Sequence, residues 1–153
     1  MSHETPHVVE GTRLIEAPPR AVWSVLSDFH GVDRWAPRVS RVEALGAVAS
    51  GPGMARRCEL RGLGSVDEVV NVWEPDERIG YRVTALGPVA ASESLWELEP
   101  VDDGGATRVR LRLRYRMRFG PAGRLLDALV ARRVLARNLR GALALLRRHV
   151  LAS

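Results

Sequence analysis

Residues 108–119 read RVRLRLRYRMRF, with arginine at every second position from Arg108 to Arg118. Successive side chains of a β-strand point to opposite faces, so this spacing predicts a long strand with one cationic face and one apolar face. A helix would scatter the same residues around its circumference. The apolar face needs a cover. We expect the leucine-rich segment 121–152 to provide it as a long helix with one apolar stripe, which includes Ala128, Leu139 and Leu146.

The rest of the chain reads as further strands with a short helical insertion. The first expected strand spans residues 8–16, Pro19 starts a helix that runs to about residue 29, and a helical turn follows at 32–35. The other expected strands span residues 39–45, 54–60, 66–73, 79–85 and 92–99. Together these elements predict an α+β fold in which a curved antiparallel sheet of about seven strands wraps around the long C-terminal helix, with two short helices after the first strand.

The turn at Asp103-Gly104 allows the strand register to be predicted. Asp-Gly is a signature of a two-residue type I′ hairpin, which pairs residues whose numbers sum to 207. Glutamates then face the arginines of the alternating strand: Glu99 faces Arg108, Glu97 faces Arg110 and Glu93 faces Arg114. We favour this cross-strand charge ladder over a phosphate-binding surface as the reason for the arginines.

The same reasoning at Pro75-Asp76 predicts which residues line the concave face of the sheet. Pairs that sum to 151 bring Glu68, Val70 and Val72 together with Ile79, Tyr81 and Val83. The face continues across the next two strands through Ser94, Trp96, Leu98, Leu111, Leu113 and Tyr115. We therefore expect a mostly apolar concave face with a few polar groups.

Composition argues against several classes of protein. The formal net charge is +5, but all 23 basic residues are arginine, they are interleaved with acids, and only 5% of residues are aromatic, so we do not expect nucleic acid as a partner. No apolar run is long enough to cross a bilayer, and the N-terminus lacks the layout of a secretory signal. With Cys58 as the single cysteine, no internal disulfide is possible. We expect a cytoplasmic monomer or homodimer.

No linker or repeat divides the 153 residues. We expect a flexible N-terminus at residues 1–7 and a single domain over residues 8–153.

Six short motifs stand out along the chain: Ile15-Glu16-Ala17-Pro18-Pro19, Val22-Trp23, Leu26-Ser27-Asp28, Trp35-Ala36-Pro37, Trp73-Glu74-Pro75 and Arg78-Ile79-Gly80-Tyr81-Arg82. Together they resemble motifs of the START/Bet v 1-like (SRPBCC) superfamily, in particular its polyketide cyclase/dehydrase and lipid-transport-like proteins. The resemblance covers nearly the whole chain. It implies a helix-grip fold with a hydrophobic cavity between the sheet and the long helix. The motif residues are mainly structural and transfer no catalytic role.

Glu68 is the most informative candidate, because an unpaired carboxylate on an apolar face is costly. Three interpretations are open. Glu68 pairs with Arg56 or Arg57 on the preceding strand, or it is desolvated and serves as a general acid or base, or a bulge turns it outward.

The candidate catalytic groups are Glu68, Tyr81 and Arg132. Arg132 is placed to hold a carboxylate or an enolate-like oxygen, or else lies with its stem on apolar surface and its head in water. The candidate ligand-binding residues are Trp35, Arg56, Glu68, Val70, Tyr81, Ser94, Trp96, Leu111, Leu113, Tyr115, Leu129 and Arg132. For the tyrosines and tryptophans, packing in the core is the simpler interpretation.

No cofactor or metal is predicted. His3, His7, His30 and His149 have no ligand-like spacing to each other or to Cys58, and Cys58 reads as a core thiol. The sequence contains no nucleotide-binding or serine hydrolase motif.

Three functions remain open. The first is binding of a hydrophobic, lipid-, aromatic- or polyketide-like small molecule in the cavity. The second is a cofactor-independent polyketide cyclase or dehydratase, and the third is an interaction module that uses the arginine face.

Overall fold

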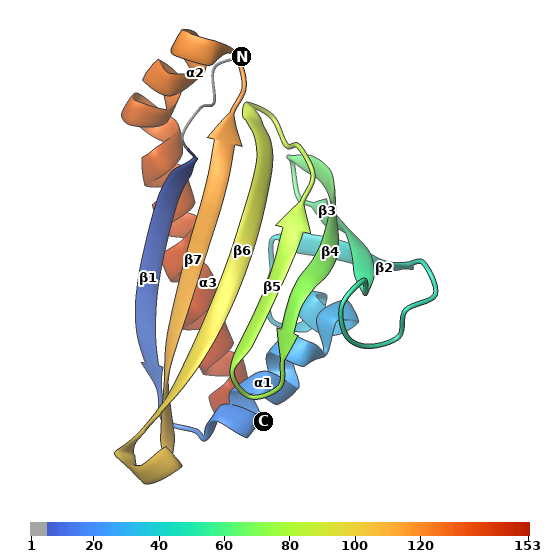
Figure 1. The fold of residues 1–153 in the computed structure, drawn as a ribbon, viewed down its shortest axis with the longest axis vertical. Coiled ribbons are helices and arrows are strands. Elements are labelled where there is room, and N and C mark those ends of the chain that lie inside the picture. Colours follow the sequence, from blue (N-terminus) through green and yellow to red (C-terminus); the bar gives the residue numbers. More distant parts are fainter. Residues whose placement is uncertain (1–5) are drawn as a thin grey trace.

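The arginine-rich strand lies inside the sheet. It is β7 (Ala106–Met117), flanked by β1 (His7–Ile15) and β6 (Val89–Val101). The computed structural model describes residues 6–153 (Figure 1), and the flexible end expected at residues 1–7 falls outside this range except for its last two residues. β1 begins within that segment, at His7, one residue before the expected start of the domain.

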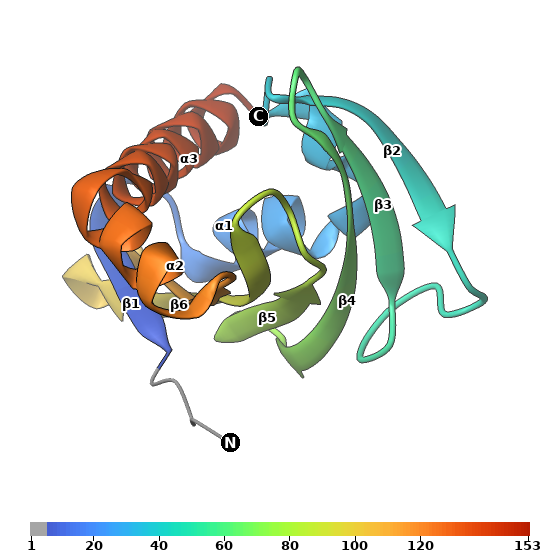
Figure 2. The same ribbon diagram turned by 90° about the horizontal axis from the view of Figure 1, so that it is seen from above.

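Seven antiparallel strands form one sheet in the order β1-β7-β6-β5-β4-β3-β2. The remaining strands are β2 (Val39–Leu45), β3 (Ala55–Leu60), β4 (Gly64–Glu74) and β5 (Arg78–Val83). The sheet curves so that β2 and β1, its two edges, approach the helices from opposite sides (Figure 2). This confirms the predicted helix-grip architecture.

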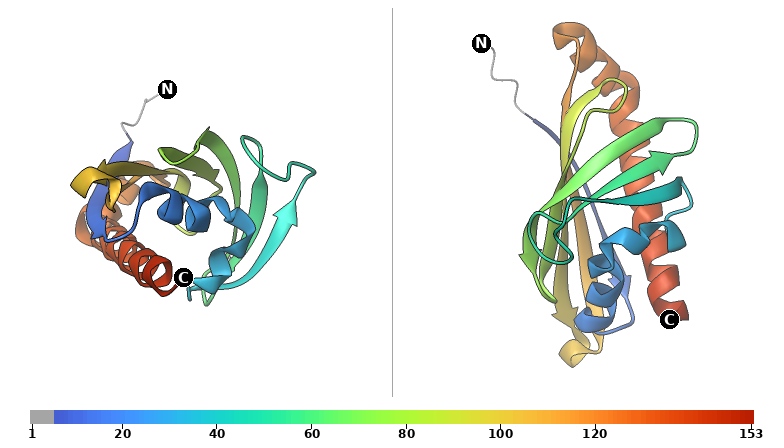
Figure 3. Two further views of the ribbon diagram at one scale, coloured as in Figure 1. Left: turned by 90° about the horizontal axis from the view of Figure 1, so that it is seen from below. Right: turned by 90° about the vertical axis from the view of Figure 1, so that its right-hand side faces the viewer.

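The helical insertion follows β1 as predicted, as α1 (Pro19–Ser27) and the 3₁₀ helix η1 (Phe29–Arg34). Pro19 occupies the first turn of α1, where its missing N–H costs no hydrogen bond. Val22 and Leu26, four residues apart, are the buried side chains of α1. The helix closes one end of the concave side of the sheet (Figure 3).

The C-terminal segment is α2 (Gly120–Leu126), the π-helical turn η3 (Asp127–Ala131) and α3 (Arg132–Ala152). The buried residues of α3 are Leu139, Leu143, Leu146 and Val150, and this stripe packs in one core cluster with residues from β1, β6 and β7. None of the helices within residues 6–153 combines the length and the apolarity needed to cross a lipid bilayer.

The β6–β7 pairing confirms the predicted register, although the predicted turn is wrong. Glu99 faces Arg108 and Trp96 faces Leu111, as expected. The last pair is Val101 with Ala106, so the loop has four residues, with η2 (Asp102–Gly104) in it, rather than two. A four-residue loop over 102–105 has the same midpoint as a two-residue turn at 103–104, and the pairing sum is therefore unchanged.

A β-bulge between Val70 and Val72 changes the predicted concave face. Val70 pairs with Tyr81 as expected, but beyond the bulge Trp73 pairs with Ile79 and Val72 with Gly80. The extra residue reverses the alternation, so Trp73 rather than Val72 joins the core. A Cβ at Gly80 would lie 3.2 Å from Cβ of Val72, and glycine allows this close approach.

The apolar stripe predicted for the C-terminal helix fails before α3. Ala128 is exposed, and Gly123 and Asp127 are the buried residues of α2 and η3. A π-helical turn holds one residue more than an α-helical turn, so a period of 100° per residue cannot continue through it.

Candidate functional site

A cavity of about 260 Å³ lies between the concave face of the sheet and the N-terminal half of α3. Its lining side chains are Leu60, Val66, Glu68, Tyr81, Val83, Thr84, Leu86, Val89, Ser92, Ser94, Leu113, Tyr115 and Leu135. Strand alternation explains the set, because Tyr81, Ser94 and Leu113 occupy neighbouring positions across β5, β6 and β7. The wall is mainly aliphatic, and its polar groups are the carboxylate of Glu68 and the hydroxyls of Tyr81, Thr84, Ser92, Ser94 and Tyr115.

Arg56 and Glu68 form a buried ion pair at this cavity. They are directly opposite each other on β3 and β4, and Nη2 of Arg56 lies 3.1 Å from Oε2 of Glu68. Arg57 pairs instead with Asp67 on the outer face, at 2.8 Å. The structure thus selects the pairing with Arg56 from the three interpretations of Glu68. The Glu68 carboxylate lines the cavity and is also paired with the Arg56 guanidinium.

Aromatic groups surround the Arg56 guanidinium. Its Cζ lies 3.7 Å from the ring centroid of Phe29 and 5.2 Å from that of Tyr81, and Nη1 donates a hydrogen bond to the Phe29 carbonyl oxygen. Burial acts to lower the pKa of Arg56, but the charge and hydrogen bond of Glu68, together with Tyr81 and Cys58, more than offset it, and the net shift is upward. Arg56 therefore remains a cation that fixes the position of Glu68.

Tyr81 presents a neutral hydroxyl to the cavity. Its oxygen accepts a hydrogen bond of 3.2 Å from Nε1 of Trp96, which leaves the phenolic proton free for another acceptor. Burial raises the pKa of Tyr81, and the negative charge of Glu68 raises it further. Tyr81, Ser94 and Glu68 can thus bind a polar group on an otherwise apolar ligand.

Cys58 lies near the Arg56–Glu68 ion pair and packs with Val32 and Val66. It is fully buried, as expected for a core thiol. Burial, together with the charge of Glu68, raises its pKa to about 12.

We predict that a thiol-alkylating reagent will label Cys58 in the native protein extremely slowly, even above pH 9.0, the ordinary pKa of a cysteine thiol. Labelling should become rapid once urea unfolds the protein. Mass spectrometry of timed samples measures this, and fast labelling of the folded protein would contradict the burial of Cys58.

Tyr115 is directed to a second polar cluster that the sequence did not suggest. Its hydroxyl donates to Oδ1 of Asp127, and Nδ1 of His7 lies 3.1 Å from Oδ2 of the same carboxylate. The His7 ring stacks on Tyr115 at 5.3 Å, and Nε of Arg132 is 4.0 Å from Oδ2 of Asp127. Asp127 is 3% exposed. The cluster joins β1, β7 and the π-helical turn.

Not all predicted ligand-binding residues reach the cavity. Glu68, Tyr81, Ser94, Leu113 and Tyr115 line it, and Arg56 supports Glu68. Val70, Trp96 and Leu111 are buried core residues, and Trp35 packs edge-on against Trp96 at 6.0 Å. These four are not among the side chains that line the cavity.

Leu129 and Arg132 lie outside the site. Leu129 is 62% exposed on the π-helical turn, because that turn directs Asp127 inward in its place. The Arg132 side chain is about half exposed and donates to the Val8 carbonyl oxygen at 3.3 Å. The two residues cannot contact a ligand in the cavity from these positions.

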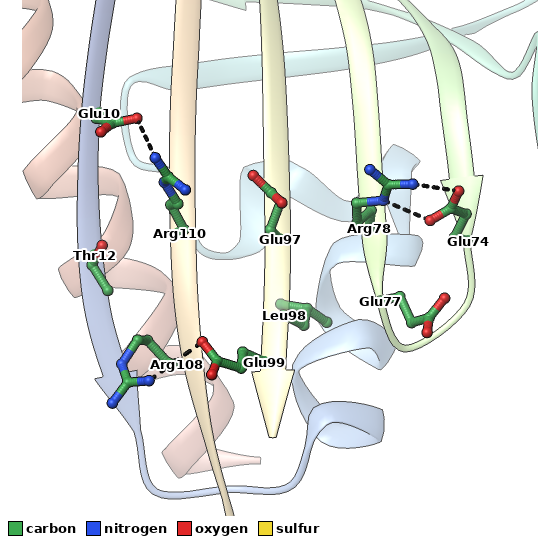
Figure 4. Close-up of a pocket in the computed structure, with 10 residues that line it drawn as sticks. All are labelled: Glu10, Thr12, Glu74, Glu77, Arg78, Glu97, Leu98, Glu99, Arg108 and Arg110. Atoms are coloured by element: carbon green, nitrogen blue, oxygen red, sulfur yellow. Dashed lines mark hydrogen bonds and ion pairs between the residues drawn. The ribbon is translucent and has the colours of Figure 1, made fainter. Parts of the chain in front are cut away.

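The outer face of the sheet holds a larger, open groove of about 700 Å³ whose lining is mainly charged (Figure 4). Arg108 pairs with Glu99 as predicted, but Arg110 and Arg112 both bind Glu10 of β1, at 2.8 and 3.2 Å. These two hydrogen bonds lower the pKa of Glu10. The ladder expected between β6 and β7 is thus partly replaced by a pairing across β1 and β7.

Glu93 faces Arg114 in the strand register, as predicted, but its carboxylate forms an ion pair with Arg82 of β5 at 3.5 Å. At the far side of the groove Arg78 binds Glu74 at 2.6 Å. The arginines of the groove are therefore engaged within the protein.

Comparison with known proteins agrees with the fold. The family model described as polyketide cyclase / dehydrase and lipid transport matches residues 6–151. No curated protein matches the chain. Many solved structures are similar, and three of them are described here.

The protein TTHA0849 from Thermus thermophilus has a TM-score of 0.76 at 24% identity, over 95% of this chain and 98% of that one. The Zhui aromatase/cyclase from Streptomyces has a TM-score of 0.71 at 24% identity, over 95% and 96%. Ara h 8.0201 has a TM-score of 0.73 at 13% identity, over 97% and 100%. At these identities the likeness establishes a shared fold.

Proposed function

The chain belongs to the polyketide cyclase / dehydrase and lipid transport family, and from this premise we propose that it binds one hydrophobic small molecule between the sheet and α3. The observation that carries the proposal is the cavity of about 260 Å³, in which an aliphatic wall faces the hydroxyls of Tyr81 and Ser94 and the carboxylate of Glu68. Ligand sites typically combine such a wall with a few convergent polar groups.

The dimensions and the polar groups limit the ligand. Cavities for drug-sized molecules run from roughly 300 to 1,000 Å³, so this one suits a compact ligand of one or two rings or a short acyl chain. The carboxylate of Glu68 accepts hydrogen bonds and disfavours an anion. The ligand we propose is therefore uncharged and carries a hydroxyl or an N–H group, directed at Glu68 and Tyr81.

The ion pair between Glu68 and Arg56 favours a binding role over a catalytic one. The Glu68 carboxylate is held by Arg56, so moving a proton to or from it would also disturb the buried guanidinium. Arg132, the group expected to steady a developing negative charge, lies outside the cavity. The proposed ligand-binding role needs only the shape and the polar groups that are present.

Filling the cavity should abolish binding while the fold is kept. We predict that Leu113→Trp weakens the affinity for the uncharged, two-ring fluorescent probe 2-naphthol by about 1.4 kcal/mol or more, which is at least tenfold in Kd. A fluorescence titration measures this, with circular dichroism to verify folding. Leu151→Trp is the matched control, because Leu151 is 43% exposed at the far end of α3. Equal affinities of a folded Leu113→Trp variant and the wild type would place the probe elsewhere and overturn the proposal.

A further inference from the structure

An exposed apolar surface, separate from the cavity, covers the upper end of the molecule. It consists of Phe119, Leu125, Leu126, Leu129, Val130 and Val134, whose exposed fractions run from 38% to 69%. We call these six residues the apical patch. It lies on α2, the π-helical turn and the first turn of α3, at the opposite end of the molecule from the C-terminus (Figures 1 and 3).

The local backbone presents these side chains outward. Asp127 points inward from the π-helical turn to Tyr115 and His7, so the opposite side of that turn, with Leu129 and Val130, faces out. Phe119 precedes α2 with φ of +72°, a left-handed conformation that is unfavourable for a bulky residue, and its side chain is 69% exposed. Residues held in such unfavourable conformations are concentrated at functional sites, which is consistent with a binding role for the exposed Phe119 ring.

The exposed charges of the segment that carries the apical patch have one sign. From Gly104 to the C-terminus Asp127 is the only carboxylate side chain, and it is buried. The exposed arginines near the patch are Arg118, Arg124, Arg132, Arg133, Arg137 and Arg140. Within residues 6–153, Arg132 is the one member of this group that lies near an acidic side chain, the Asp127 described above. The apolar side chains of the patch and these exposed arginines thus belong to the same stretch of chain.

We propose that the apical patch docks on the surface of a membrane containing anionic lipid. In such docking the apolar side chains enter the boundary between headgroups and acyl chains, and the arginines extend to the phosphates. Apolar area and basic charge on one helical surface are the two contributions that such binding combines. The arrangement here supplies both from a single short stretch of chain.

A second copy of this chain fits the patch less well. A twofold interface would place the same surface against itself, so that the two sets of arginines would face each other without a carboxylate between them. Like charges brought together in this way are unfavourable. An anionic surface satisfies the same arginines without that cost.

Docking would also bring the cavity close to the membrane. Val134 of the patch is followed in sequence by Leu135, which lines the cavity, and Tyr115 of the cavity wall is bonded to the π-helical turn. A hydrophobic ligand would then have a short route between bilayer and cavity. The docking itself does not rest on the proposed ligand-binding function.

Sedimentation of the full-length protein with lipid vesicles tests the proposal. We expect binding to vesicles of phosphatidylcholine with phosphatidylglycerol, much weaker binding to phosphatidylcholine alone, and weakening as salt is added. The double variant Leu129→Gln/Val130→Gln and the double variant Arg133→Gln/Arg137→Gln should each weaken the binding by roughly tenfold or more. Leu151→Gln and Arg148→Gln are matched controls at the other end of α3 and should bind as the wild type does.

A reporter on the patch distinguishes insertion from loose electrostatic attraction. Cys58 is buried, so Leu129→Cys provides the reactive thiol for an environment-sensitive bimane label. A blue shift with phosphatidylglycerol vesicles at position 129, and none for labelled Leu151→Cys, would support docking. The absence of vesicle binding, equal shifts at both positions, or a dimer whose formation depends on Leu129 and Val130 would overturn it. None of these outcomes depends on a ligand in the cavity.

Discussion

Arg56→Met is expected to lower the free energy of unfolding by about 3 kcal/mol or more, because it leaves the buried carboxylate of Glu68 without its cation. The side chains of Arg56 and Glu68 are 6% and 11% exposed, so water screens the remaining charge poorly. The variant also removes the cation that lies on the Phe29 ring and the donor to the Phe29 carbonyl oxygen. Urea denaturation followed by circular dichroism measures the difference.

The double variant Arg56→Met/Glu68→Met separates the charge effect from packing. With both charges gone the penalty of an unpaired carboxylate disappears, so we expect it to be more stable than Arg56→Met alone. Arg57→Met is the control, since Arg57 forms a similar pair with Asp67 on the exposed face and should change stability little. If Arg56→Met and Arg57→Met proved equally mild, the buried pair would not have the structural role assigned to it.

Leu146→Ala should have a comparably large effect, with a loss of about 2–5 kcal/mol in the free energy of unfolding. Leu146 is fully buried where α3 lies on the sheet, in the same cluster as Ile15 and Val109. Removing most of its side chain leaves a cavity between two rigid surfaces that cannot easily close. The same denaturation experiment gives the value.

Leu151→Ala, five residues later on the same helix, is its matched control. Leu151 is 43% exposed, and its truncation should change stability by no more than about 0.5 kcal/mol. Similar losses in the two variants would mean that α3 is not held to the sheet by the stripe that contains Leu146.

The sequence predicted the fold well because its strongest pattern lies in β7, a strand with neighbours on both sides. The alternation along β7 showed which face of the sheet is apolar. The pairing of residues whose numbers sum to 207 then gave the apolar face of β6. That assignment survived a wrong turn type, since the pairing depends on the midpoint of the loop and not on its conformation. The motif resemblance then agreed with the same topology.

Three of the errors in side-chain placement share one physical origin. The bulge in β4 and the π-helical turn each add one residue, and one residue is enough to exchange the faces of a strand or to rotate a helix. Val72, Ala128 and Leu129 were misplaced for this reason. Neither irregularity has a local sequence signature as clear as those of a turn or a helix cap.

The candidate site was recovered in part. Glu68 and Tyr81 follow from strand alternation, whereas the choice between Arg56 and Arg57 required the geometry of the turn between β3 and β4. The contact of Asp127 with Tyr115 and His7 joins three distant segments and follows no spacing rule. One signal was present, since Asp127 is an isolated carboxylate on a leucine- and arginine-rich helix.

The π-helical turn also defines how this chain can change in length. A deletion of one residue within 127–131 would restore regular α-helical hydrogen bonding and leave the packing of α3 below it intact. It would leave the orientation of α2 relative to α3 nearly unchanged, because the π-helical turn fits its additional residue into about the same rotation as an α-helical turn. Relatives that differ here by a single insertion or deletion would therefore share the sheet, the cavity and the orientation of α2, while presenting different side chains on the surface of this turn.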